Sequence, residues 1–270
     1  MNVVFEGGGV KGLAYIGALR YLETRGLRIA NCAGTSVGAI IACLVIAGYD
    51  SYELENIINS LDVNKLWPKQ KKNTIKNTIY VIKNRHVYSI KPLEETLRYL
   101  LKRRGICTFK DLRVGNNYRL KIIVTSKETK KMVILPEGIK EFGINPDNLD
   151  VASAACMSAS LPFIYPSYKI KTHSFVDGGL TENFPLWIFN ENVYGFRLNN
   201  NNKGITKTVK KMFVKTRTKG DQENIIYIDT SGYKATDFLK GMQERYILYN
   251  RGFYYTKMYF DKIFLKNKIL

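Results

Sequence analysis

Two short apolar runs near the start of the chain each end in a glycine-rich turn that is followed by a helical pattern. The first run leads into GGGVKG at residues 7–12, and the second leads into GTSVGA at residues 34–39. A repeated order of strand, turn and helix is typical of proteins whose strands form a parallel sheet covered by helices on both faces. This order constrains the fold more than any other feature of the chain.

The remaining hydrophobic pattern extends the alternation along the chain. Short apolar runs predict strands, and apolar residues spaced by three and four positions predict helices. The expected strands are 3–5, 27–33, 120–125, 132–135, 175–176, 193–198 and 225–229, and the expected helices are 11–24, 37–47, 51–61, 92–104, 148–158 and 236–250. A length of 270 residues suits one α/β domain. We therefore predict a single domain over residues 1–270, in which residues 62–115 form a flap or an insertion.

The second turn, G-x-S-x-G around Ser36, has the form of a nucleophile elbow. In such an elbow, a sharp strand-to-helix turn holds the serine hydroxyl clear of the sheet. Gly34 and Gly38 are required because the turn brings backbone and side chains into close contact on both sides of the serine. The motif alone is weak, since a serine before a helix can equally act as an N-terminal cap. The glycine turn upstream favours the nucleophile.

The first glycine turn admits two interpretations. GGGVKG fits the dinucleotide fingerprint, but that fingerprint requires an acidic residue at the end of the next strand, and here that strand ends in Cys-Ala-Gly. The alternative is an oxyanion hole, in which Gly7, Gly8 and Gly9 turn backbone N–H groups towards a carbonyl oxygen. The N–H of Val37 would complete this hole. Lys11 and Gly12 open the following helix, whose N-terminus favours negative charge.

A nucleophilic serine needs a proton acceptor, and the chain has only two histidines. His86 stands in a basic, polar segment, where a surface position is expected. His173 precedes Asp177 by four residues in an extended segment, which at about 3.3 Å per residue separates the two by about 13 Å. A Ser-His-Asp triad is therefore hard to build. Asp177, followed by Gly178 and Gly179, is the more economical base, although the same turn alone could be an ordinary β-turn.

Taken in order, GGGVKG, GTSVGA and the DGG turn at 177–179 resemble the motifs of the patatin-like phospholipases, a family of serine acyl hydrolases. The segment SASLPF at 158–163 resembles a further motif of that family, and so do Asn183 and Pro185 after the aspartate. Lys11 stands where the family often has arginine. The resemblance extends from residue 1 to about residue 196, and it is weak over residues 62–115 and 203–270.

The resemblance implies a three-layer α/β/α fold with a mainly parallel central sheet, and a catalytic dyad of Ser36 and Asp177. It also implies an oxyanion hole from Gly7, Gly8 and Gly9, and calcium-independent hydrolysis of acyl esters of glycerophospholipids. We expect no metal and no cofactor. Two alternatives on the same fold are a general carboxylesterase or acyltransferase and a catalytically inactive lipid-binding protein.

The net charge of +19 indicates an acidic partner. Residues 204–220 carry six lysines and arginines and no acidic residue, and aromatic residues recur between 253 and 260. Near an anionic membrane each basic residue contributes about 1 kcal/mol to binding. The aromatic side chains can anchor at the head-group level of the membrane, or they can equally pack in the core of the protein. Nucleic-acid binding is the alternative, but neither zinc-ligand spacing nor an RNA-binding aromatic strand is present. We expect a phospholipid membrane surface as the partner, and no nucleic acid.

The sequence indicates the location of the protein in the cell less clearly than it indicates the fold. Glu6 and the glycine cluster interrupt the N-terminus before a secretory signal can form. The longest apolar run, residues 37–47, is far shorter than the ~20 residues of a membrane-spanning helix. We therefore expect a cytoplasmic protein that associates peripherally with membranes, although export of an effector is compatible with the same features. The sequence leaves the oligomeric state open.

Overall fold

The computed structural model describes residues 1–67, 86–199 and 224–267. The strands are β1 (Asn2–Phe5), β2 (Asn31–Thr35), β3 (Arg113–Val114), β4 (Asn117–Tyr118), β5 (Leu120–Ser126), β6 (Met132–Leu135), β7 (Tyr168–Ile170), β8 (His173–Asp177), β9 (Val193–Asn199) and β10 (Ile225–Asp229). The α-helices are α1 (Ala14–Thr24), α2 (Val37–Ile46), α3 (Ser51–Ser60), α4 (Val63–Leu66), α6 (Lys91–Arg103), α7 (Val151–Ala159), α9 (Phe238–Gln243) and α10 (Arg245–Asn267). Short 3₁₀ helices include η1 (Gly9–Leu13), η2 (Phe109–Leu112), η3 (Glu137–Phe142), η4 (Pro146–Asn148), η5 (Gly178–Leu180) and η6 (Leu186–Ile188).

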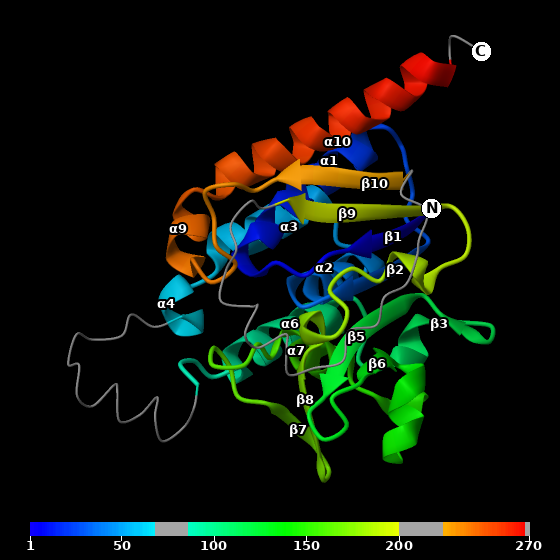
Figure 1. Ribbon diagram of the computed structural model, residues 1–270, viewed down its shortest axis with the longest axis vertical. Helices are drawn as coiled ribbons and strands as arrows, with labels where there is room; N and C mark the ends of the chain where they lie inside the picture. Colours follow the sequence, from blue (N-terminus) through cyan, green and yellow to red (C-terminus); the bar gives the residue numbers. More distant parts are fainter. Residues whose placement is uncertain (68–85, 200–223, 268–270) are drawn as a thin grey trace.

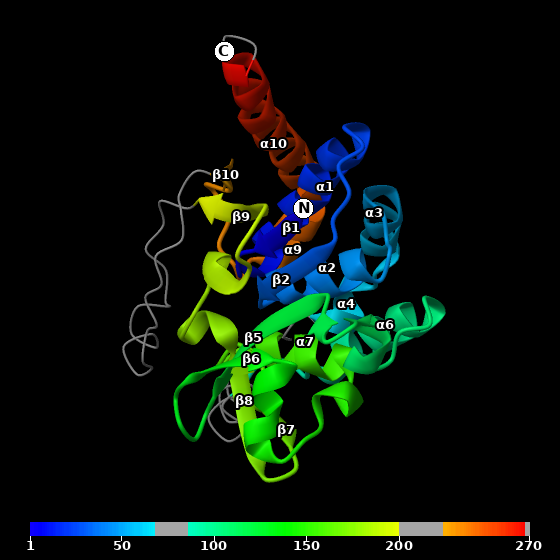
Figure 2. The same cartoon turned by 90° about the vertical axis from the view of Figure 1, so that its right-hand side faces the viewer.

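The central sheet is mainly parallel. Within the described ranges it has eight strands, in the order β10-β9-β1-β2-β5-β8-β7, with β6 also paired to β5. The strands from β10 to β5 are mutually parallel, whereas β6 and β8 run antiparallel to β5. Helices flank this sheet (Figures 1 and 2). The predicted α/β fold with a mainly parallel sheet is therefore confirmed.

The two faces of the sheet bury different sets of side chains. In β1, Val3 and Phe5 belong to the main core, which α1, α2, α7 and α10 cover. Val4, between them, points to the opposite face and packs with Leu186 of η6 in a smaller cluster. Apart from the half-buried asparagine that begins each of them, β1 and β2 are fully buried and consist of apolar or small residues, which is typical of central parallel strands.

Helix α10 lies against α1, and glycines let the two backbones approach closely. A Cβ atom on Gly17 would overlap the backbone carbonyl of Tyr249, and one on Gly252 would overlap that of Ala14. The aromatic residues predicted to anchor in a membrane or to pack in the core mostly pack. The ring of Tyr21 contacts Phe253 and Phe260 at centroid distances of 5.6 and 5.8 Å.

Two predicted elements differ from the structure. The helix expected at 236–250 is two helices, and α10 continues to Asn267, with Phe253 and Phe260 packing on Tyr21 of α1 beyond the expected end. The strand expected at 27–33 is shifted to Asn31–Thr35, where it pairs with β1. Within residues 62–115, where a flap or an insertion is predicted, α6 buries Leu97 and Leu101 and packs on α2 and α7. Residues 68–85 lie outside the described residues, so the flap itself stays a prediction.

No helix in the described part of the chain combines the length and the apolar character needed to cross a bilayer.

Candidate active site

The turn between β2 and α2 forms a strained elbow at Ser36. This residue has φ 56° and ψ −126°, a conformation that costs a non-glycine residue roughly 1–3 kcal/mol. A Cβ atom on Gly34 would overlap the backbone of Gly38, and one on Gly38 would overlap the carbonyl of Phe5. Neither side of the serine therefore has room for a side chain larger than that of glycine. The elbow leaves the Ser36 side chain half-buried at the carboxyl edge of the sheet.

The buried hydroxyl of Ser158 forms a hydrogen bond with the backbone of the elbow. The backbone N–H of Ser36 donates to Oγ of Ser158 at 2.8 Å, and that hydroxyl donates to the carbonyl of Ile123 at 2.6 Å. Ser158 is fully buried at the end of α7. It therefore links the nucleophile turn to β5 and α7.

The structure brings Ser36 and Asp177 into direct contact. Oγ of Ser36 donates to Oδ2 of Asp177 at 2.7 Å, within the range for direct proton transfer. The strand register explains the contact, because Thr35 pairs with Ile123 and Asp177 pairs with Val124, the next residue of β5. Asp177 is 4% exposed. The two side chains meet at one level of the sheet although β8 runs antiparallel to β5.

The second carboxylate oxygen and the backbone of Asp177 are also held. Oδ1 accepts the N–H of Gly179 at 2.7 Å, and the N–H of Asp177 donates to the carbonyl of Ser160 at 3.0 Å. The hydroxyl of Thr125 donates to the Asp177 carbonyl at 3.0 Å. A Cβ atom on Gly178 would overlap the carbonyl of Ile123. This turn fixes the carboxylate so that Oδ2 faces the serine.

The glycine turn after β1 offers fewer amides than its sequence suggested. The N–H of Gly7 donates to the carbonyl of Asn183 at 3.1 Å, and the side-chain amide of Asn183 donates back to the carbonyl of Gly7 at the same distance. The prediction that Gly7 supplies an oxyanion donor is therefore corrected, because its N–H is already engaged. Its small size still matters, since a Cβ there would overlap Asn183 and lie 3.2 Å from Cβ of Ser36.

The amides of Gly8, Gly9 and Val37 stay available. None of the residues that the structure describes accepts a hydrogen bond from them. Gly9 has φ +57°, and a Cβ atom there would overlap the carbonyl of Ala235. Val37 is the first residue of α2, so its N–H has no partner within the helix. Gly12 allows η1 to pack directly on the Val37 side chain, where a Cβ atom would lie 2.6 Å from a methyl carbon.

A buried charged group lies beside the glycine turn. Glu6 accepts the N–H of Leu198 at 2.8 Å and pairs with Arg197 at 3.4 Å between Nε and Oε1. Burial raises the pKa of the Glu6 carboxyl, while Arg197, the Leu198 N–H and Lys11 lower it in part. Lys11 is itself 7% exposed, and a Cβ on Gly8 would lie 3.4 Å from its Cε. Glu6 and Lys11 thus place opposite charges next to the glycine turn after β1.

The histidines occupy other positions. His173 begins β8, four extended residues before Asp177, and its ring contacts Phe142 at a centroid distance of 5.0 Å. His86 forms an isolated bridge with Phe163. Neither histidine donates to or accepts from Ser36 Oγ in the described structure, where Asp177 is the partner of that hydroxyl.

Sequence reasoning missed the roles of Ser158, Asn183 and Glu6. The first two were noted as parts of a motif, but nothing in the local pattern indicates that Ser158 holds Ser36 or that Asn183 ties the glycine turn to the Asp177 turn. Glu6 stands at the end of a buried strand, and a charged residue in that position could have indicated a local ion pair. No cluster of three metal-ligating side chains occurs within residues 1–67, 86–199 and 224–267.

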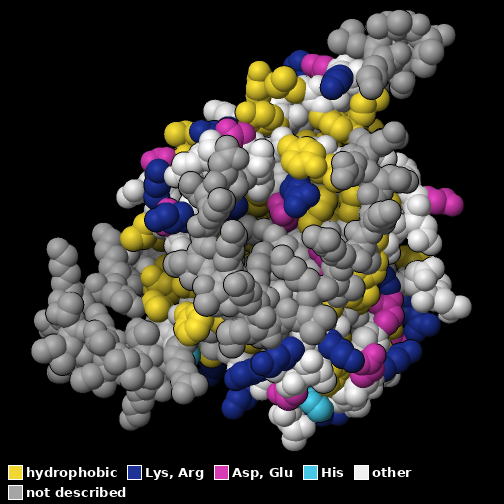
Figure 3. Space-filling view, in the orientation of Figure 1, with side chains coloured by type: hydrophobic (Ala, Val, Ile, Leu, Met, Phe, Trp, Pro, Cys, Tyr) yellow, Lys and Arg dark blue, Asp and Glu magenta, His cyan; other side chains and the backbone are white. Residues whose placement is uncertain are grey.

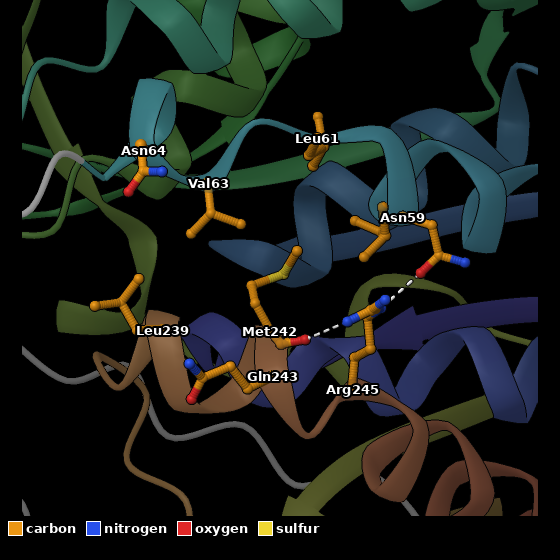
Figure 4. A pocket seen from close by; sticks show the side chains of 9 residues that line it. Asn59, Leu61, Val63, Asn64, Leu239, Met242, Gln243 and Arg245 are labelled. Atoms are coloured by element: carbon orange, nitrogen blue, oxygen red, sulfur yellow. Dashed lines mark hydrogen bonds between the residues drawn. The ribbon is translucent and has the colours of Figure 1, made fainter.

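Two cavities lie near α9. One, of about 280 Å³, lies between the α3–α4 connection and the α9–α10 connection. There the guanidinium of Arg245 donates to the side chain of Asn59 at 2.6 Å and to the carbonyl of Met242 at 2.8 Å (Figure 4). The other, of about 520 Å³, has aromatic walls, and Leu239 lines both.

Fold and site together define a class: an α/β protein with a serine elbow at the carboxyl edge of its sheet, an aspartate in contact with that serine, and amides available beside them. The family model of the patatin-like phospholipases matches residues 3–190. The chain belongs to the patatin-like phospholipase family, and this membership supports a lipid hydrolase.

Two proteins are similar to this chain in sequence over most of its length. An uncharacterized protein of Bacillus subtilis strain 168, YqhO, is 31% identical, with 95% of this chain and 96% of that protein aligned. The protein 463L of Invertebrate iridescent virus 6, named a probable lipid hydrolase, is 27% identical over 68% of this chain and 61% of its own length.

Solved structures show the same fold at low identity. VipD from Legionella pneumophila superposes with a TM-score of 0.63 at 15% identity, covering 97% of this chain and 66% of VipD. ExoU from the type III secretion system of Pseudomonas aeruginosa, solved as a complex with SpcU, superposes with a TM-score of 0.56 at 19% identity. That match covers 97% of this chain but 51% of the ExoU chain, so the chain spans about half the length of this neighbour.

Proposed function

We propose that the protein is a calcium-independent phospholipase A, or lipid acyl hydrolase, that cleaves acyl esters of glycerophospholipids through a Ser36–Asp177 dyad. The observation that carries the proposal is the 2.7 Å hydrogen bond from Ser36 Oγ to Asp177 Oδ2 on a strained elbow. A buried carboxylate in contact with a serine hydroxyl can accept its proton as the hydroxyl attacks a carbonyl.

The reaction follows from these atoms. Ser36 Oγ bonds to the ester carbonyl carbon while its proton passes to Asp177. The negative charge that develops on the carbonyl oxygen is stabilised by the amides of Gly8, Gly9 and Val37. The carbon–oxygen bond to the leaving alcohol then breaks, and Asp177 returns the proton to that alcohol. Water next attacks the acyl-enzyme, again giving its proton to Asp177, and releases the fatty acid as Ser36 recovers its proton.

A lipid substrate is supported by family membership and by the description of the viral relative as a probable lipid hydrolase. The charge of the chain also fits a substrate embedded in an anionic surface. We further propose peripheral association with membranes, in which residues 204–220 contribute basic charge; these residues lie outside the described ranges. Neutralising the lysines of that segment is expected to weaken binding to anionic vesicles in low salt, and unchanged binding would remove the segment from this proposal.

The test is fatty-acid release from mixed phospholipid vesicles in the presence of a chelator, comparing the wild type with Ser36→Ala. Chelator-resistant release that vanishes in the variant is the expected result. Equal release by both proteins would show that Ser36 is not the nucleophile. Hydrolysis of a soluble short-chain ester without any release from vesicles would favour the carboxylesterase on the same fold.

A further inference from the structure

An aromatic cluster lies at the same edge of the sheet as the candidate site. Trp67, Tyr88, Ile164, Phe238 and Leu239 line the cavity of about 520 Å³. The rings of Trp67 and Phe238 stack with centroids 4.5 Å apart and an interplanar angle of 3°. Tyr88 meets Phe238 edge-on at 6.5 Å. These residues come from the end of α4, where Trp67 follows the helix, from α9 and from two loops, so the cluster joins segments that are distant in sequence.

Backbone hydrogen bonds hold the loops of this cluster in place. The N–H groups of Val87 and Tyr88 both donate to the carbonyl of Ile164, at 3.2 and 2.9 Å. The indole N–H of Trp67 donates to the hydroxyl of Tyr165 at 2.7 Å. Phe163, which directly precedes Ile164, is 59% exposed.

The cluster adjoins the glycine turn of the candidate site. Ala235, whose neighbour Thr236 lines the cavity, accepts the N–H of Val10 at 3.0 Å through its carbonyl. The same carbonyl is the atom that a Cβ on Gly9 would overlap. The arrows of β1, β9 and β10 point towards the side of the molecule that holds α4 and α9 (Figure 1). A ligand lying on the cluster would therefore be next to the amides of the glycine turn.

The outer edge of the cluster exposes two large apolar side chains. Phe163 and Leu239 are 59% and 41% exposed, and hydrophobic side chains gather over the α4 and α9 end of the molecule (Figure 3). Exposed aromatic and aliphatic side chains beside a cavity are a feature of interaction sites. Tryptophan and tyrosine, which the cluster also contains, favour the head-group region of a bilayer.

The charge of the adjoining sequence identifies the kind of surface that this edge would meet. The sequence between Trp67 and His86 is PKQKKNTIKNTIYVIKNR, which carries six lysines and arginines and no acidic residue. Trp67, directly before this sequence, and Val87, two residues after it, both line the cavity. Positive charge beside an apolar edge is complementary to an anionic lipid surface, where both hydrophobic and electrostatic attraction act together.

We propose that the aromatic rim, defined as Trp67, Tyr88, Phe163, Ile164, Phe238 and Leu239, is the surface by which the protein docks on an anionic phospholipid bilayer. This proposal rests on the proposed function, because it names the surface that would bring the substrate to Ser36. Phe163 and Leu239 enter the interface, and Trp67 and Tyr88 lie at its head-group level. The bilayer then meets the molecule at the edge that carries the glycine turn.

A second exposed apolar stripe provides a matched control. Ile247, Tyr254 and Met258 lie on one face of α10 and are 46%, 55% and 50% exposed. Helix α10 runs from α9 towards the opposite end of the molecule (Figure 1). This stripe has exposure similar to that of the rim but lies largely away from the candidate site.

The experiment measures binding to vesicles in the Ser36→Ala background, so that the lipid stays intact. The rim variant carries Phe163→Asn and Leu239→Gln; asparagine suits the positive φ of 70° at position 163. The control carries Tyr254→Gln and Met258→Gln on α10. Binding is measured by co-sedimentation with vesicles of phosphatidylcholine containing phosphatidylglycerol and with vesicles of phosphatidylcholine alone, and the thermal midpoint of each variant confirms folding.

We expect the rim variant to lose about tenfold or more in partitioning to the anionic vesicles, because two large apolar side chains no longer enter the interface. The α10 control should bind as the parent does. Equal vesicle binding by the rim variant and the parent would overturn the proposal. A loss of vesicle binding in the α10 variant alone would also overturn it, and so would binding of the parent to neutral vesicles as tight as its binding to anionic ones. If the wild-type protein binds vesicles through its rim but releases no fatty acid, the proposed function is refuted while the docking proposal still holds.

Discussion

The buried hydroxyl of Ser158 should control how well Ser36 is positioned. It accepts the Ser36 N–H at 2.8 Å and donates to the carbonyl of Ile123 at 2.6 Å. Ser158→Ala removes both hydrogen bonds, and at about 0.5–1.5 kcal/mol for each the free energy of unfolding should fall by about 1–3 kcal/mol. The elbow at Ser36, with φ 56°, would then lose one of the contacts that hold its strained conformation.

The effect on activity can be separated from the effect on stability. A displacement of about 1 Å at a reacting group can cost about 10²-fold in rate, so we expect kcat on a soluble short-chain ester to fall by about 10–100-fold, with a smaller change in KM. Labelling of Ser36 by an alkyl fluorophosphonate, followed by mass spectrometry well below the thermal midpoint, should slow in parallel.

Ser153→Ala is the matched control for this prediction. Ser153 is 8% exposed on the same helix, and its hydroxyl donates to Glu94 and accepts from Arg98, both at 3.2 Å. It has no contact with the elbow, so its loss should lower stability while kcat stays unchanged. Equal kcat values for the two variants, at temperatures where both are folded, would refute a positioning role for Ser158.

Three further predictions concern Asp177, Glu6 and Gly252. Asp177→Asn cannot accept the proton of Ser36, so kcat should fall by about 10² or more with little change in the circular dichroism spectrum; near-normal turnover would exclude the dyad. Burial raises the pKa of Glu6 above its ordinary value of 4.5, so the folded state takes up this proton at higher pH than the unfolded chain does. Lowering the pH from neutral to about 4.5 should therefore stabilise the wild type relative to Glu6→Gln in urea unfolding, and a difference independent of pH would contradict the burial argument. Gly252→Ala should lower the free energy of unfolding by about 1–3 kcal/mol, because its Cβ would overlap the carbonyl of Ala14; a thermal midpoint at or above that of the wild type would show that α1 and α10 can separate without cost.

The sequence by itself determined the features that depend on neighbouring residues. The order of strand, glycine turn and helix predicted a mainly parallel α/β fold, because periodicity and turn chemistry are local properties of the chain. The same local logic singled out Ser36 between two glycines and Asp177 before two more. It also argued against a triad, since the four-residue spacing from His173 depends only on the length of an extended segment.

Only the tertiary structure decided which distant groups meet. Ser36 lies 122 residues from Ser158 and 141 from Asp177, and Gly7 lies 176 residues from Asn183. The antiparallel pairing of β8 with β5 sets the level of Asp177, and no local pattern reveals that register. The amide of Gly7 could be recognised as engaged only when Asn183 was placed beside it. Strand pairing and close packing, which join residues without regard to their separation in sequence, therefore decided which amides, hydroxyls and carboxylates of the candidate site are available for chemistry.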